Sequence, residues 1–319
     1  MKALTDWLVY LAVRVVICVM QTLRLETCHH LARLLAVLAC DIIRLRFHVV
    51  DDNIRHAFPD LSPTQRRILA RRMWEHLLLM VCEIAHVPRK VHATNWRQYF
   101  RITRQRELVQ YLLDQRPVVV VSGHFGNFEL GSYMTGLLGF PGYAIARPLD
   151  NRYLNRFVNR FRAAYGQFIL PKEGSAAQVK AVLDAGGLIS LLGDQHAGPK
   201  GCWVDFLGRP ASCHKAVAVF TLTGGAPLVV AYARRVGEPL QFELGLMGVA
   251  DPHVPGAELA NVKTLTRWYN AMLEQAIRRA PEQYWWVHRR WKGEPPRKRT
   301  GAKADEQTLA LQQADRSAA

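Results

Sequence analysis

From residue 107 onward, short apolar runs alternate with helical stretches, and this alternation restricts the fold more than any other feature of the chain. The runs expected as strands are Val118–Val121, Tyr143–Ala146, Phe168–Leu170, Leu188–Leu192, Leu228–Ala233 and Phe242–Leu246. The helices expected around them are Glu107–Gln115, Phe128–Leu138, Arg152–Tyr165, Ser175–Asp184, Ser212–Leu222 and Leu259–Arg279. Strands separated by helices of about ten to fifteen residues are typical of βαβ units. The pattern therefore predicts an α/β fold, with a mostly parallel central sheet flanked by helices.

The N-terminal part of the chain carries two apolar stretches, Trp7–Met20 and Leu31–Ile43. Each is shorter than the ~20 residues that a spanning helix needs, and Arg14 interrupts the first. No small-residue cleavage site follows, which argues against a removable signal peptide. We expect a membrane-associated helical segment that lies in the interface, near lipid phosphates. A helical pair packed on the domain core is the alternative.

Composition divides the chain into three parts, with residues 1–46 as the N-terminal apolar helices and residues 47–292 as the main domain. Within the main domain, Ser62 or Asp60 is placed to cap a helix that has Pro63 in its first turn. Residues 293–319 are basic at first and then polar and alanine-rich, which predicts a disordered tail.

The net charge and the cysteines restrict the partners and the compartment. A formal charge of +16 favours acidic partners, such as nucleic acid, anionic lipid, a phosphorylated substrate or an acidic carrier protein. The six cysteines have no paired spacing, so reduced thiols are expected rather than disulfides or a zinc site. We expect neither a metal nor a cofactor.

The segment from His124 to Glu129, of sequence His-Phe-Gly-Asn-Phe-Glu, follows the four-valine run Val118–Val121 through a Ser-Gly turn. Open α/β sheets bind their ligands where the strands end, which is where this segment lies. If His124 lies in the turn and Glu129 in the first helical turn, the carboxylate can fold back onto the imidazole. Such a pair makes a general base for a hydroxyl group. A structural histidine with satisfied hydrogen bonds is the alternative.

Three more polar clusters follow expected strands or close the domain. Arg147 follows one strand and offers a planar donor for a phosphate or for a developing oxyanion. Asp194 and Gln195 follow another, although an Asp at such a turn often only caps the backbone. Arg209 is expected near a helix N-terminus, which is unfavourable for the helix dipole unless the side chain reaches the cleft. The segment from Pro281 to Lys292 mixes aromatic and cationic residues, which suits a membrane interface or single-stranded nucleic acid.

Several other chemistries lack their motifs in this sequence. No Gly-x-Ser-x-Gly elbow, no phosphate-binding Gly-rich loop and no His-Glu-x-x-His helix occurs. No residue stands out as a covalent nucleophile. Direct attack by an activated acceptor hydroxyl is therefore favoured over a covalent intermediate on the protein.

Together these motifs resemble the bacterial lipid A biosynthesis acyltransferases, the late Kdo-dependent lauroyl and myristoyl transferases. The resemblance runs from the N-terminus to about residue 292. It is carried by the segments 52–59, 123–129, 146–151, 193–201 and 280–291. The His-x-x-x-x-Glu spacing is shared with glycerolipid acyltransferases, which typically have Asp at the second position.

The resemblance implies a membrane-bound enzyme on the cytoplasmic face of the inner membrane. Such an enzyme moves a fatty acyl chain from acyl carrier protein, or acyl-CoA, to a hydroxyl of a lipid A precursor or a related phosphorylated lipid. By analogy, His124 is the general base and Glu129 its orienting partner. The analogy assigns substrate binding or site support to a further set of residues: Asn127, Arg147, Asp194, Gln195, Arg209, Arg289 and Arg290.

Two alternatives stay open from the sequence. The same His-Glu dyad could act on a lysophospholipid, a glycolipid or an aminolipid. A basic protein that binds membrane or nucleic acid without catalysis is the other, although we expect no nucleic-acid partner. A binding protein has no need for polar residues converging at neighbouring strand ends.

Overall fold

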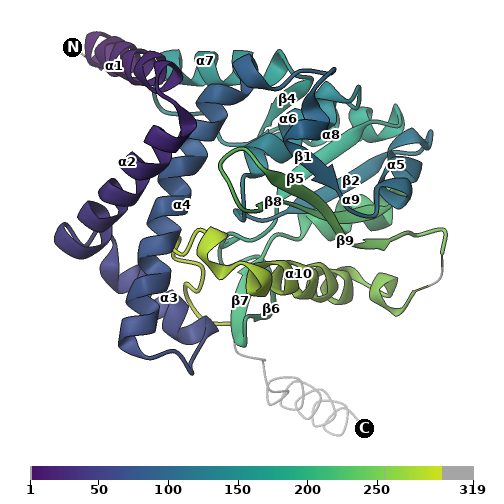
Figure 1. Ribbon diagram of the computed structural model, residues 1–319. Helices are drawn as coiled ribbons and strands as arrows, with labels where there is room; N and C mark the ends of the chain where they lie inside the picture. The colour runs from purple at the N-terminus through teal and green to yellow at the C-terminus, as the bar shows by residue number, and fades with distance from the viewer. Residues whose placement is uncertain (1, 255, 297–319) are drawn as a thin grey trace, which may run out of the picture.

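A seven-stranded sheet forms the centre of the computed structural model, which describes residues 2–254 and 256–296 (Figure 1). The strand order is β1-β9-β8-β2-β5-β3-β4, and only the β8–β9 pair is antiparallel. The strands are β1 (Phe100–Ile102), β2 (Val118–Ser122), β3 (Gly142–Ala146), β4 (Gln167–Pro171), β5 (Leu188–Leu192), β8 (Leu228–Arg235) and β9 (Phe242–Ala250). The predicted α/β fold with a mostly parallel sheet is confirmed.

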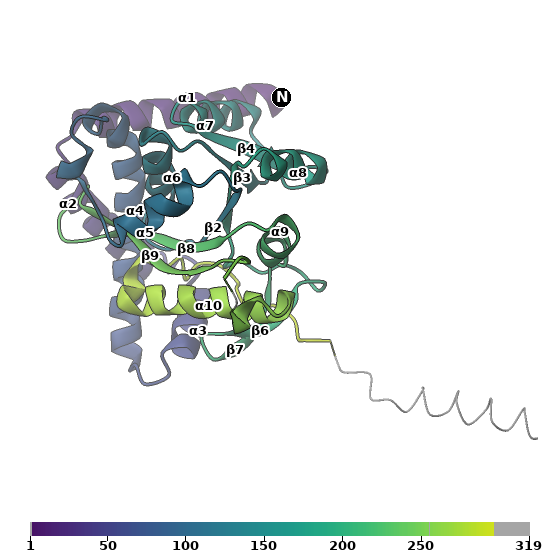
Figure 2. The same ribbon diagram turned by 90° about the vertical axis from the view of Figure 1, so that its right-hand side faces the viewer.

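Helices cover both faces of this sheet, as the view along it makes clear (Figure 2). One face packs against α5 (Gln105–Leu113) and α6 (Phe128–Leu137). The other face packs against α8 (Ala176–Asp184), α9 (Ala216–Gly224) and α10 (Val262–Arg279). Three of the four valines of β2, Val118, Val119 and Val121, are almost completely buried because the strand is covered on both sides, and this explains its continuous β-branched run.

Two predicted helices start more than two residues too early. The helix expected from Leu259 begins at Val262. The expected helix Ser212–Leu222 begins instead at Ala216, and the residues before it form β7 (Arg209–Cys213). This strand pairs with β6 (Cys202–Phe206) in a separate antiparallel hairpin. Arg209 is therefore a strand residue and not a helix N-terminal one. Val204, Phe206, Ala211 and Cys213 bury one face of the hairpin against the core, and tertiary packing of this kind overrides a local helical pattern.

The long helix α4 (Pro63–Lys90) braces the N-terminal elements against the domain. It begins with a capping box in which Ser62 accepts from the Gln65 amide, so the Ser62 alternative of the predicted cap is the one found. Packed along it are α2 (Leu25–Val37), the π-helix η1 (Leu38–Ile42) and α3 (Phe47–Ala57). Short 3-10 turns complete the described elements: η2 (Trp96–Gln98), η3 (Ala257–Leu259) and η4 (Pro281–Gln283).

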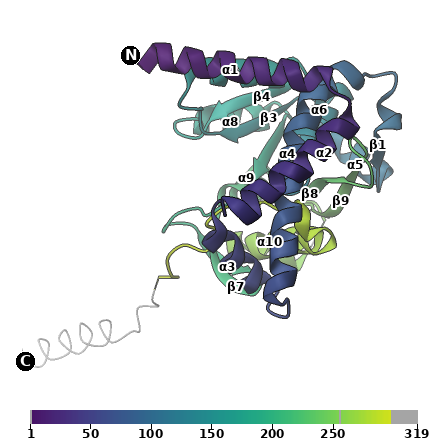
Figure 3. The same cartoon turned by 60° about the vertical axis from the view of Figure 1, so that its left-hand side comes forward.

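Helix α1 (Lys2–Thr22) buries none of its residues, and it lies along one edge of the molecule (Figure 3). It is long and apolar enough to cross a membrane, and it is longer than the apolar run Trp7–Met20 suggested. It lies beside α7 (Arg152–Ala163), where Tyr10 contacts Tyr153 and Phe157 at ring-centroid separations of 6.1 and 6.2 Å. A membrane-associated N-terminal segment is consistent with this exposed apolar surface.

The predicted division into three parts stays a prediction. Helix α2 buries Cys28, Ala32 and Ala36 in its contact with the rest of the protein, so it is packed on the domain rather than free of it. The predicted disordered tail, residues 293–319, lies outside the described residues from residue 297 onward.

Candidate active site

His124 lies in the turn that connects β2 to α6, as the sequence predicts. The turn is tightly constrained, because Gly126 has a φ of +61° and a Cβ there would lie 1.9 Å from the carbonyl oxygen of Ala233. Only glycine fits such a position without displacing β8. The backbone amide of Gly126 donates to Gln283, and that of Asn127 donates to Ala233. The polypeptide around His124 is therefore fixed by its neighbours.

The carboxylate that orients the imidazole belongs to Asp194. Its Oδ1 lies 2.8 Å from His124 Nδ1, and its Oδ2 accepts from the His124 amide at 2.8 Å. Neighbouring parallel strands end side by side, with Ser122 of β2 opposite Leu192 of β5, and this register brings the two turns together. Burial would raise the pKa of Asp194, but the contacts with His124 and the charge of Arg290 lower it to about 2. Asp194 is therefore ionised at neutral pH.

Glu129 does not take the place that the sequence predicted for it. It lies in the first turn of α6, beyond the Asn127 cap, and both of its oxygens accept from the Arg162 guanidinium of α7. The helix start turns the Glu129 side chain toward α7, while the imidazole faces the β5 turn. Asp194 thus has the orienting contact expected of Glu129, and Glu129 forms an ion pair of its own.

The imidazole of His124 lies in a cluster of aromatic rings. Phe128, Trp285 and His288 have ring centroids 5.0, 5.2 and 5.0 Å from it. Gln195 follows Asp194 in the chain and lies 3.1 Å from His124 Nε2. The C-terminal segment is held here because the Trp285 amide donates to the His124 carbonyl oxygen.

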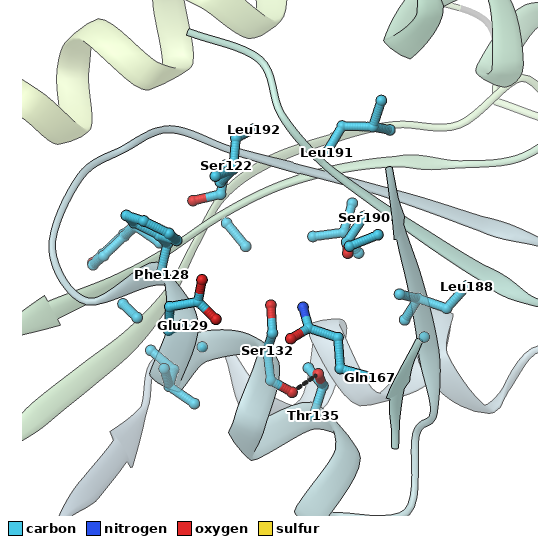
Figure 4. A pocket seen from close by; sticks show the side chains of 18 of the residues that line it. Ser122, Phe128, Glu129, Ser132, Thr135, Gln167, Leu188, Ser190, Leu191 and Leu192 are labelled. Atoms are coloured by element: carbon cyan, nitrogen blue, oxygen red, sulfur yellow. Dashed lines mark hydrogen bonds between the residues drawn. The ribbon is translucent and has the colours of Figure 1, made fainter. Parts of the chain in front are cut away.

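A mainly apolar cavity of about 170 Å³ begins beside this cluster, between the sheet and helices α5 and α6 (Figure 4). Residues along the whole length of the strands line the cavity. Ser122 and Leu192 lie at the carboxyl ends, and Leu188 and Gly142 lie at the amino ends. Glu129 and Arg162 contribute a charged pair to the wall. The cavity thus extends from the His124 end of the strands toward their opposite ends, a shape suited to a linear hydrocarbon chain.

A second buried polar network supports the turn from behind. Glu83 of α4 accepts from Arg235 at 2.6 Å with both oxygens, and Arg235 lies 2.9 Å from His76 Nδ1. His76 Nε2 in turn lies 3.2 Å from the Gly126 carbonyl oxygen, and the Asn127 amide group contacts Glu83. This network joins α4 and β8 to the turn that carries His124.

The other predicted substrate-binding residues differ in exposure, from buried to exposed. Asn127 and Arg290 are buried, and Arg290 donates to the Ser212 carbonyl oxygen and to Cys213 Sγ. Buried side chains with these internal partners cannot contact a membrane phosphate, so Arg290 corrects the expectation for its position. Arg147, by contrast, is exposed and pairs with Asp150. Arg209 lies 3.8 Å from Asp52, and Arg289 is exposed.

Arg162 and His288 are site residues that sequence reasoning did not single out. Arg162 lies in the last turn of α7 and points inward to Glu129. The indication in the sequence that a cation should lie here was Glu129, because a carboxylate enclosed by an apolar wall needs a cation. His288 was part of the aromatic and basic segment, and only the fold brings it to His124.

Comparisons with known proteins show the family of the chain. The family model described as bacterial lipid A biosynthesis acyltransferase matches residues 1–293. A lipid A biosynthesis lauroyltransferase of Escherichia coli (strain K12) is 27% identical over 297 residues, covering 91% of this chain and 92% of the relative. A lipid A biosynthesis palmitoleoyltransferase of the same organism is 25% identical over 269 residues, covering 82% and 83%.

Among solved structures, the 1-acyl-sn-glycerophosphate acyltransferase of Thermotoga maritima is similar with a TM-score of 0.38 and 11% identity. The similarity covers 83% of this chain and 100% of that one. The family match, which covers almost the whole described chain, is the stronger finding. The chain therefore belongs to the bacterial lipid A biosynthesis acyltransferases, and the protein is an acyltransferase.

Proposed function

We propose that the protein transfers a fatty acyl chain from acyl carrier protein, or from acyl-CoA, to a hydroxyl of a lipid A precursor at the cytoplasmic face of the inner membrane. The observation that carries this proposal is the His124–Asp194 pair, which lies two residues beyond Ser122 and Leu192 in the wall of a mainly apolar cavity. The relatives are named for lauroyl and palmitoleoyl transfer, which agrees with a cavity for a hydrocarbon chain. A net charge of +16 suits an acidic carrier protein and a phosphorylated acceptor.

In the proposed reaction, His124 Nε2 takes the proton of the acceptor hydroxyl as the oxygen attacks the thioester carbonyl carbon. The carbon–sulfur bond then breaks, and the thiolate takes the proton from the imidazolium. Asp194 holds the Nδ1–H and stabilises the positive charge that His124 gains. No covalent acyl-enzyme is needed, because the alcohol attacks the donor directly.

Glu129 and Arg162 have a separate role in this proposal. They lie in the wall of the cavity in which the acyl chain of the donor would lie. Glu129 fixes the Arg162 guanidinium, whose positive charge can stabilise negative charge that develops on the thioester oxygen. Glu129 would thus act on the reaction through Arg162 and not through His124.

The phosphate groups of the acceptor would lie outside the cavity. Arg147, Arg209 and Arg289 keep exposed or half-exposed guanidinium groups, which are suited to bidentate phosphate contacts. The exposed apolar surface of α1 would hold the protein at the membrane in which this acceptor lies.

The experiment that tests the function is an acyl-transfer assay with mass-spectrometric detection. The purified protein is offered acyl carrier protein or acyl-CoA thioesters, with a tetra-acylated lipid A precursor or a lysophospholipid as acceptor. Gain of one acyl group on the lipid A precursor is the expected result. Gain on lysophospholipid alone would reassign the acceptor, and no transfer to either would contradict the proposal.

The cavity is tested in the same assay by Ala144→Leu, which fills the cavity wall on β3. Overfilling a packed site costs about 1–3 kcal/mol, so the longest accepted chains should be used about 5- to 150-fold less, with shorter chains spared. Ala177→Leu on the exposed surface of α8 is the matched control. An unchanged chain-length preference in Ala144→Leu would place the acyl chain elsewhere.

A further inference from the structure

The side-chain amide of Gln195 lies between two imidazole rings. Its Nε2 is 3.1 Å from His124 Nε2 and 3.0 Å from His288 Nε2. Gln195 comes from the turn after β5, whereas His288 comes from the segment that follows η4. The amide therefore joins the proposed base to the C-terminal segment.

The hydrogen-bonding roles in this bridge follow from Asp194. Because Asp194 is ionised, it requires a proton on the facing nitrogen, so neutral His124 carries its hydrogen on Nδ1. His124 Nε2 then has only a lone pair, and a neighbouring group must donate to it. The Gln195 nitrogen, with two N–H donors, meets this requirement, whereas its oxygen would not.

His288 accepts the second N–H of the same amide. Burial, followed by the charge of His124, lowers the pKa of His288 to about 4, so this ring is neutral at neutral pH. The Trp285 ring stacks on it at an interplanar angle of 20° and a centroid distance of 5.5 Å. A fixed acceptor on one side holds Gln195 in the orientation that donates to His124 on the other.

This arrangement occupies the lone pair that the proposed reaction uses. We propose that Gln195, positioned by His288, donates to the lone pair of His124 Nε2 until an acceptor hydroxyl displaces the amide. This arrangement favours transfer over hydrolysis of the donor. The inference rests on the proposed function. Both residues are positioning residues, because they act through His124.

Chemistry gives the reason for such a device. Water attack would convert the thioester to a free fatty acid and a thiol, with His124 taking the proton from water and passing it to the thiolate. Water has only its own hydrogen bonds with which to displace the amide. A lipid acceptor also has binding free energy from its head group and chains, and this energy is available to move Gln195 aside.

The test compares Gln195→Ala and His288→Ala with the wild-type protein. Free fatty acid and new ester are measured together by mass spectrometry, with and without acceptor. Loss of one hydrogen bond at the base should raise acceptor-free hydrolysis about two- to tenfold and lower the ratio of transfer to hydrolysis. Exposed residues supply matched controls, Gln110→Ala on α5 and His92→Ala after α4, and both should behave as wild type.

Two further variants make the result specific. His288→Gln keeps an oxygen that can accept the Gln195 N–H, so it should restore the ratio in part. In the double variant His124→Ala, Gln195→Ala, the added hydrolysis should disappear, because it depends on the base. A merely structural role for either residue predicts a parallel loss of both products instead.

The outcomes separate this inference from the proposed function. If wild type transfers acyl chains but Gln195→Ala leaves the transfer-to-hydrolysis ratio unchanged, the positioning role is overturned and the function stands. If wild type transfers to no acceptor, the function fails. Even then, acceptor-free hydrolysis still shows whether Gln195 restrains His124.

Discussion

A half-buried histidine, His124, and a buried one, His76, lie at the same turn, and their surroundings are opposite in charge. His124 begins the turn and faces the carboxylate of Asp194. His76 lies behind it, next to the Gly126 carbonyl oxygen, and faces the guanidinium of Arg235. A carboxylate favours the imidazolium form, whereas a guanidinium opposes it. The difference separates a ring suited to proton transfer from a ring suited to structural support.

The hydrogen bonds of His76 complete this contrast. Burial and then the charge of Arg235 lower its pKa well below 6.5, so the ring is neutral. Its Nδ1 accepts from Arg235, and its Nε2–H donates to Gly126. Both nitrogens are thus committed within the protein. His124 keeps Nε2 directed to Gln195, a partner that a substrate hydroxyl can replace.

The largest effect is expected from removing the charge that distinguishes the two histidines. Asp194→Asn preserves the shape of the side chain but no longer favours the Nδ1–H tautomer or the imidazolium. We expect transfer to fall about 10²–10⁴-fold, the range for loss of general acid–base catalysis. The measurement is kcat for transfer together with the melting temperature. A variant with near-normal kcat would contradict the role of Asp194 in supporting His124 as the base.

The structural role of the network around His76 predicts a loss of stability when that network is broken. Arg235→Met leaves the carboxylate of Glu83, which is 0% exposed, without its cation. Breaking a buried ion pair from one side costs about 3–5 kcal/mol, which urea unfolding measures directly. Arg106→Met on the exposed surface of α5 is the control. Equal unfolding free energies for the two variants would contradict a supporting role for the Glu83–Arg235 pair.

A smaller effect follows from the neutral histidines. The folded pKa of His76 is lowered, and that of His288 is about 4, whereas both are about 6.5 in the unfolded chain. Between these values the unfolded chain binds protons that the folded protein does not. Stability therefore falls as the pH decreases from about 6.5, by at most about 1.4 kcal/mol per pH unit for each histidine.

His76→Gln removes one of these titrations. Melting temperatures measured from pH 7 down to pH 5 should fall less steeply in this variant than in the wild-type protein. The same slope in both proteins would mean that His76 is not held neutral by its surroundings.

Most of the fold could be predicted from the sequence because its sheet is built from local signals. The apolar runs 118–121 and 188–192 are buried or half-buried in a sheet that helices cover on both faces, so their pattern needed no tertiary information. The hairpin of β6 and β7 was missed, because its pairing depends on contacts with the core. Residues 212–215 have a helical pattern, and packing overrides it.

The candidate site was predictable only in part. His124 and Asp194 could be placed at strand ends from the sequence, but their pairing depends on β2 and β5 being neighbours in the sheet. Local spacing favoured Glu129, which the start of α6 directs to Arg162 instead. His288 lies 164 positions after His124 in the sequence, and no local rule connects the two residues.

The most direct test of the central claim compares His124→Ala with His76→Gln in one experiment, measuring acyl transfer and melting temperature for each. We predict that His124→Ala abolishes transfer with little change in melting temperature. His76→Gln should have the opposite effect, with a lower melting temperature and little change in transfer per folded molecule. Near-normal transfer by His124→Ala would contradict the assignment of His124 as the base.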